Sequence, residues 1–165
     1  MLRFIVLALL ASGLFAFAPT HLSAQIIFTA EVEGKLTRPD TPCPDGAFRC
    51  GEALVAGFGA AEWRLFFISF APVSDSCGQY EAIVTFMLTD GSTITLSETG
   101  TVCGPGKSFF ATPPFSWGNP DRATGSWEVL DGNGQFSNVT NGRGTNLARS
   151  AGASLRGTYT GILEE

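Results

Sequence analysis

The chain has 165 residues, of which 44% are hydrophobic and 15% are charged, and its 15 acidic residues outnumber its 10 basic ones. This length suits one domain with a hydrophobic core of its own. The acidic balance, without basic clusters along the sequence, argues against nucleic acid and against anionic membranes as partners.

Residues 1–24 have the layout of a secretory signal peptide, with Arg3 ahead of an apolar run over 4–18. We expect cleavage after Ala24, which leaves one secreted domain, 25–165, in an extracellular or periplasmic location. An uncleaved membrane anchor is the alternative. The apolar run falls short of the ~20 residues that a spanning helix needs, so we expect no membrane insertion of the mature chain.

The mature chain would contain no histidine, because His21 lies in the expected signal peptide. Serine or cysteine nucleophiles paired with histidine are then excluded, and the commonest zinc ligand is missing. Acid–base chemistry would have to use carboxylates, Tyr, Lys or Arg. Asp131 and Asn133 begin like a calcium loop, but Gly142 stands where the bidentate Glu should be. We expect neither a metal nor a cofactor.

The mature chain shows the two-residue period of β-strands from its beginning. "FTAEVEGKL" (28–36) alternates apolar or small residues with polar ones, so one face suits a core and the other suits water. "AEWRLFFISFAPV" (61–73) is instead apolar on both faces. This composition predicts a strand that lies between a barrel interior and something that covers its outside.

A β-hairpin is predicted over 80–89 and 92–102, because Asp90-Gly91 separates two alternating runs. In the second run Ile94 and Leu96 share the apolar face.

The four cysteines indicate two disulfides, since an even count behind a signal peptide is typical of oxidised secreted domains. Three pairings are possible. We favour Cys43–Cys50 and Cys77–Cys103, because the second pair would join the open end of the hairpin. A four-thiolate metal site is the rival interpretation, but the sequence has no C-x-x-C pair.

The segment 104–122 is long for a plain connection and is rich in aromatic residues, so we expect a flap that its aromatic side chains pin to the barrel. Exposed instead, those side chains would form a binding patch. Two further strands are predicted, over 125–132 with Trp127 on its apolar side, and over 154–165. No segment has helical periodicity with caps.

"DGNGQFSNVTNGRG" (131–144) is best explained as the corner of a barrel, in which Gly132 and Gly134 take positive φ and Phe136 enters the core. Asn138 also begins a glycosylation sequon. Together with "GTYTGIL", this stretch resembles the C-terminal pattern "GTFTVTGGTGRF … GTFTGTL" of a group of small secreted bacterial proteins. A similar corner occurs in dirigent proteins and allene oxide cyclases. The resemblance covers about the last third of the chain, and it implies an all-β fold, a single antiparallel barrel of about eight strands.

Function is expected to centre on the inside of that barrel. We predict a secreted, non-catalytic protein that binds a small apolar molecule. The first alternative is a cyclase- or isomerase-like enzyme that uses an inward-facing Arg and a carboxylate, and the second is a structural or envelope-associated module without a ligand. The candidate ligand-binding residues come from the two aromatic strands: Trp63, Arg64, Phe66, Trp127 and Glu128.

Overall fold

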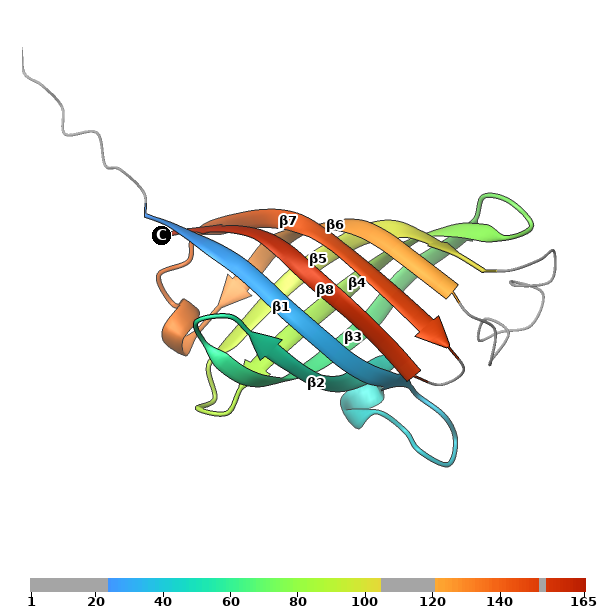
Figure 1. Cartoon of the computed structure of the whole chain (residues 1–165), viewed down its shortest axis with the longest axis horizontal. Coiled ribbons are helices and arrows are strands. Elements are labelled where there is room, and N and C mark those ends of the chain that lie inside the picture. Colours follow the sequence, from blue (N-terminus) through green and yellow to red (C-terminus); the bar gives the residue numbers. More distant parts are fainter. Residues whose placement is uncertain (1–23, 105–120, 152–153) are drawn as a thin grey trace, which may run out of the picture.

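The computed structural model describes residues 24–104, 121–151 and 154–165 (Figure 1). The expected signal peptide and most of the 104–122 segment lie outside the described residues. Eight strands form one closed antiparallel barrel in which each strand pairs with its neighbours in the chain and β1 pairs with β8. The strands are β1 (Gln25–Leu36), β2 (Arg49–Val55), β3 (Gly59–Pro72), β4 (Cys77–Leu88), β5 (Thr93–Cys103), β6 (Asp121–Gly132), β7 (Asn141–Ala151) and β8 (Ser154–Glu164). The all-β class and the eight antiparallel strands are therefore confirmed.

The predicted hairpin is confirmed as β4 and β5. Gly91 has a φ of +88°, which favours glycine, and the Ser92 N–H donates to Asp90 Oδ1 at 2.9 Å. Cys77 lies opposite Cys103 at the far end of the hairpin, where the two residues form a disulfide. Cys43 and Cys50 form the second disulfide, so both favoured pairings are present.

The interior is packed with side chains from alternate positions of the strands. The largest apolar side chains that are fully buried are Trp63, Trp127, Tyr159, Phe28, Phe86, Phe136, Ile94, Leu96, Leu155 and Leu163. The Phe28 ring meets Phe86 and Trp127 edge to face, with ring centroids 5.7 and 5.4 Å apart. Such edge contacts favour one fixed arrangement of the rings. These three rings therefore pack against one another inside the barrel.

Glycines make room for these rings. Gly144 on β7 lies opposite Gly161 on β8, and a Cβ added to either would lie about 2.5 Å or less from the Trp127 ring. Gly144 and Gly161 thus mark the close approach of the Trp127 ring to the backbone.

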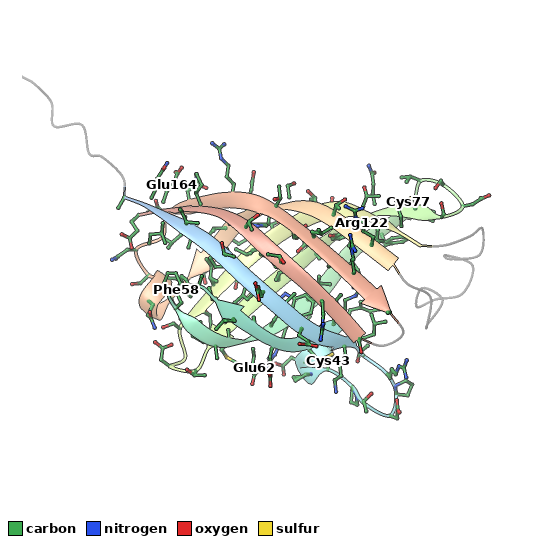
Figure 2. The ribbon with its side chains drawn as sticks, in the orientation of Figure 1. Cys43, Phe58, Glu62, Cys77, Arg122 and Glu164 are labelled. Carbon is green, nitrogen blue, oxygen red and sulfur yellow. A yellow bond between two sulfur atoms is a disulfide. The ribbon has the colours of Figure 1, made fainter. Side chains whose placement is uncertain are left out.

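The barrel corner closes one end, which we call the Phe136 end and which lies at the left of Figure 1. Phe136 is fully buried in the short 3-10 turn Gly134–Phe136, and its ring lies 4.6 Å from that of Phe58, labelled in Figure 2. Gly134 has a φ of +58° as predicted, but Gly132 does not take a positive φ. Gly132 is needed for a different reason: a Cβ there would lie 2.6 Å from the Phe136 carbonyl oxygen.

The opposite end of the barrel, the Cys77 end, carries the two disulfides on its outside (Figure 2). Cys43, Ala47 and Cys50 form a small buried cluster that packs against Phe66 on the outer face of β3. This cluster is the cover predicted for that strand, and it ends there, because Ile68 is 62% exposed. No helix among the described residues is long and apolar enough to cross a membrane.

Candidate ligand site inside the barrel

The five residues expected from the sequence to bind a ligand lie on both sides of the barrel wall. Trp63 and Trp127 point inward and are buried. Arg64 lies on the outside, where it forms ion pairs with Asp45 and, at 2.7 Å, with Glu62. Phe66 is covered by the Cys43–Cys50 segment, and Glu128 is exposed to solvent. The structure therefore does not bring Arg64 and Glu128 together, and neither of them lines the interior.

A different carboxylate lies inside the barrel. Glu98 on β5 is 1% exposed and accepts hydrogen bonds from three side chains of three other strands. The Tyr80 hydroxyl and Asn146 Nδ2 donate to its Oε1 atom at 2.5 and 2.8 Å, and the Tyr159 hydroxyl donates to Oε2 at 2.7 Å. We call Tyr80, Glu98, Asn146 and Tyr159 the polar cluster.

Burial dominates the electrostatics of this cluster. Removal from water raises the pKa of Glu98, while hydrogen bonds from Tyr80, Tyr159 and Asn146 and the charge of Arg49 oppose the shift. Removal from water also raises the pKa of both tyrosines, and the neighbouring Glu98 raises it further. The two phenols therefore remain neutral donors, and Glu98 is the group of the cluster that can gain or lose a proton nearest to neutral pH.

Two glycines give the cluster its space. Gly100 on β5 lies directly opposite Gly125 on β6. A Cβ at Gly100 would lie 2.7 Å from the Tyr80 hydroxyl, and a Cβ at Gly125 would lie 2.5 Å from Asn146 Oδ1. Any larger residue at either position would displace Tyr80 or Asn146. The two glycines therefore make room for the polar cluster inside the barrel.

A cavity of about 20 Å³ adjoins the cluster on the side of the Cys77 end. It is lined by Arg49, Trp63, Leu65, Phe67, Tyr80, Glu98, Val102, Ala123, Asn146, Ala148, Leu155 and Tyr159. A volume of this size holds about one water molecule. Two large side chains of the lining come from paired strands: Arg49 is at the first position of β2, and Phe67 lies on β3.

Some buried polar atoms of this lining lack a hydrogen bond within the described part of the chain. Trp63 Nε1 and Asn146 Oδ1 are buried and have no hydrogen-bond partner of good geometry among the described residues. The Trp63 N–H lies close enough to the Tyr159 hydroxyl to lower its pKa. Trp127 differs, because its Nε1 atom donates to the Thr145 carbonyl oxygen at 3.2 Å. Buried polar groups are usually satisfied, so an unsatisfied donor and acceptor in one lining indicate a place for a further polar group.

The two-residue alternation of the sequence could have identified Glu98 as an inward-facing residue. In "STITLSETG" Glu98 stands at the same two-residue phase as Ile94 and Leu96, so a carboxylate falls on the apolar face of the strand. Asn146 and Arg49 gave no comparable signal, because no strand was predicted around either of them.

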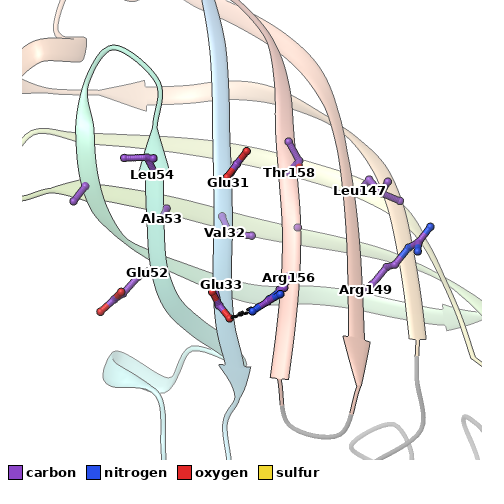
Figure 3. Close-up of a pocket in the computed structure, with 12 residues that line it drawn as sticks. Glu31, Val32, Glu33, Glu52, Ala53, Leu54, Leu147, Arg149, Arg156 and Thr158 are labelled. Carbon is purple, nitrogen blue, oxygen red and sulfur yellow. Dashed lines mark hydrogen bonds and ion pairs between the residues drawn. The ribbon is translucent and has the colours of Figure 1, made fainter.

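The outside of the barrel has a wider hollow. An open groove of about 750 Å³ crosses β2, β1, β8 and β7 between the exposed residues Leu54 and Leu147 (Figure 3). Its charged residues, Glu31, Glu33, Glu52, Arg149 and Arg156, are all solvent-exposed. The groove has no buried polar side chain among its described lining residues. No group of acidic, Cys or His side chains suited to a metal ion occurs in the described part of the chain.

Comparison with family models, with curated proteins and with solved structures finds no match to this chain.

Proposed function

We propose that this protein is a secreted barrel that binds a small, mostly apolar molecule, with a hydroxyl or carbonyl group of that molecule placed at the polar cluster. The observation that carries the proposal is a buried carboxyl group, held by three donors, beside a cavity whose lining includes an unsatisfied donor, Trp63 Nε1, and an unsatisfied acceptor, Asn146 Oδ1. Apolar pockets with a few convergent polar groups and a perturbed carboxyl are the usual form of a small-molecule site.

The energetic cost of the cluster supports this proposal. Burying a carboxyl group in an apolar core destabilises a fold unless its partners compensate, and apolar side chains of similar size often do as well or better. The rest of this interior is filled by aromatic and aliphatic side chains that show such packing to be possible here. Binding of a ligand would explain why a carboxyl group, rather than an apolar side chain, is buried at position 98.

The volume of the cavity limits how a ligand enters. Because about 20 Å³ suits one water molecule, an organic ligand would have to displace side chains. Arg49 and Phe67 are large side chains of the lining on the paired strands β2 and β3, and Phe67 is only half-buried. We therefore propose that entry moves these two outward. The ligand would then place its polar group against Asn146 and Trp63.

Secretion is part of the same proposal. The apolar N-terminal run supports it, as do the two disulfides, which are typical of oxidising compartments. The first strand begins at Gln25, directly after the expected cleavage site. The closed eight-stranded barrel and the buried Phe136 corner likewise support a relationship to the allene oxide cyclase and dirigent-like barrels.

A fluorine NMR binding experiment tests the proposal, with 4-fluorophenol as the probe and fluorobenzene as the analogue that lacks a hydroxyl. We expect 4-fluorophenol to bind more tightly than fluorobenzene and Glu98→Gln to weaken its binding by about tenfold, or ~1.4 kcal/mol. Glu128→Gln is the matched control, because Glu128 is exposed on the outer face of neighbouring β6. Equal binding of both probes, or equal loss in both variants, would contradict the proposal.

The raised pKa of Glu98 specifically favours a second candidate, a cyclase- or isomerase-like enzyme. A carboxyl group whose pKa moves toward neutrality is suited to transfer protons. The barrel-lining arginine and carboxylate of such an enzyme would be Arg49 and Glu98. A ligand that wild-type protein converts, and Glu98→Gln leaves unchanged, would support the enzyme over the binding protein.

A further inference from the structure

A row of three arginines crosses the outer face of the barrel near the Cys77 end. Arg122 on β6 lies directly opposite Arg149 on β7, and Arg149 lies directly opposite Arg156 on β8. Residues opposite each other in antiparallel strands point to the same face, with Cβ atoms about 4.5–5.5 Å apart. All three are exposed, so their guanidinium groups share one strip of surface.

Only one of these arginines has an acidic partner within the described ranges. Arg156 donates from Nε and Nη2 to Glu33 Oε1 at 3.0 and 2.8 Å, the contact drawn as a dashed line in Figure 3. Arg122 and Arg149 form no ion pair with any residue that the structure describes. Like charges directly opposite each other destabilise a sheet, and this chain is acidic overall. Neither the overall charge of the chain nor the stability of the sheet therefore explains why three arginines lie in a row.

The row also borders a hollow in the surface. A groove of about 690 Å³ is lined by all three arginines and by Glu33, the partner of Arg156, together with Cys103, Gly104, Ser150, Ala151, Ser154 and Leu155. Arg149 and Arg156 also line the groove of Figure 3, so they project between two adjoining grooves. A ligand larger than a single ion could therefore contact the row along its length.

We propose that the row Arg122–Arg149–Arg156 binds a ligand that carries oxyanion groups, carboxylate, sulfate or phosphate. A guanidinium group matches such groups with two parallel N–H donors, and these charge-assisted bonds are stronger than neutral ones. Arg122 and Arg149 provide two charges that form no ion pair with an acidic side chain among the described residues. Arg156, held by Glu33, closes the row on the side of β1. The site is separate from the inner cavity and does not depend on the function proposed for it.

Calorimetric titration of the secreted protein tests this site with three probes: inorganic phosphate, a galacturonic acid oligomer and a sulfated oligosaccharide. The test variant is Arg122→Gln/Arg149→Gln. Its control is Arg143→Gln, which removes an exposed arginine of the same strand β7 that lies opposite Glu128. We expect the control to bind as the wild type does, and the double variant to bind at least about tenfold more weakly. Affinity should fall as salt is added.

The three probes distinguish the sources of the anion. Binding of phosphate alone would assign the site to a free ion, and preference for one oligosaccharide would assign it to an acidic saccharide. The double variant should unfold at the same temperature as the wild type or a higher one, because it loses only like-charge repulsion. Failure of every probe to bind at low salt, or equal weakening by the control, would overturn the proposal.

Discussion

Glu98 is the buried carboxyl group of the barrel interior, and the proposed binding function depends on it. It is the buried carboxylate to which Tyr80, Asn146 and Tyr159 converge from three strands. Burial makes its charged form costly, and the three donors together with Arg49 reduce that cost. A group held in this balance responds to pH and to any molecule that changes its surroundings.

Glu98 should make the protein less stable as the pH rises. Its pKa is raised in the folded state above the ordinary value of 4.5. Above that pH the unfolded chain releases the proton first while the folded protein retains it, so the free energy of unfolding falls until the folded pKa is passed. The slope of this contribution approaches about 1.4 kcal/mol per pH unit.

Urea unfolding from pH 4 to pH 9 measures this effect as the difference between wild type and Glu98→Gln. Because Gln does not ionise, we expect the variant to lose the Glu98 part of the decline, so it gains stability relative to wild type as the pH rises. Glu128→Gln should not show this change. A difference between wild type and Glu98→Gln that is independent of pH would refute the assigned role.

The two tyrosines should contribute unequally, although both donate to the same carboxyl group. Tyr159 supplies the hydrogen bond to Glu98 Oε2, whereas Tyr80 shares Oε1 with Asn146. Tyr159→Phe therefore leaves an oxygen without this donor and should cost about 1–3 kcal/mol, more at high pH. Tyr80→Phe should cost less, because Asn146 remains. Equal costs in denaturant titrations would show that the two oxygens are not distinguished in this way.

At the scale of the strand, alternation explains both what the sequence predicted and what it missed. The two-residue period placed Phe28, Ile94 and Trp127 on inward faces, and the structure confirms these positions. The hairpin was predictable because Asp90-Gly91 fixes the turn locally. By contrast, β2 and β7 were not predicted, since Gly, Arg and Asn interrupt the apolar face that would mark a strand.

The missing strands explain the missing site. Arg49 lies on β2 and Asn146 on β7, so neither could be placed inside the barrel. Arg64 was a reasonable candidate among the aromatic residues of β3, but its strand phase turns it outward toward Asp45 and Glu62. Convergence of side chains from β4, β5, β7 and β8 depends on barrel closure and register, which local patterns do not specify.

Glycine positions on β8 make an independent prediction at this scale. A Cβ at Gly161 would lie 2.2 Å from the Arg143 carbonyl oxygen, which is backbone and cannot move aside. At Gly157 the nearest atoms would be 3.0 Å away. Gly161→Ala should therefore destabilise the fold by about 2 kcal/mol more than Gly157→Ala. Thermal unfolding of both variants checks this, and a larger loss for Gly157→Ala would contradict the packing described for Trp127.

For the whole molecule, the two halves of the interior differ in kind. Toward the Phe136 end, Phe28, Phe86 and Trp127 interlock and fill the space. Toward the Cys77 end, the polar cluster and its cavity break that packing, and the disulfides lie on the outside of the same end. Packed aromatic rings thus fill the half toward the Phe136 end, whereas the half toward the Cys77 end contains the buried polar groups and the cavity.

The central claim is that the cavity half of the barrel holds a small molecule. Native mass spectrometry of the gently purified protein tests this claim most directly. The claim predicts a mature chain with two disulfides plus a small non-covalent adduct, which is diminished in Glu98→Gln and retained in Glu128→Gln. The mass of the bare chain in wild type and in both variants alike would contradict it.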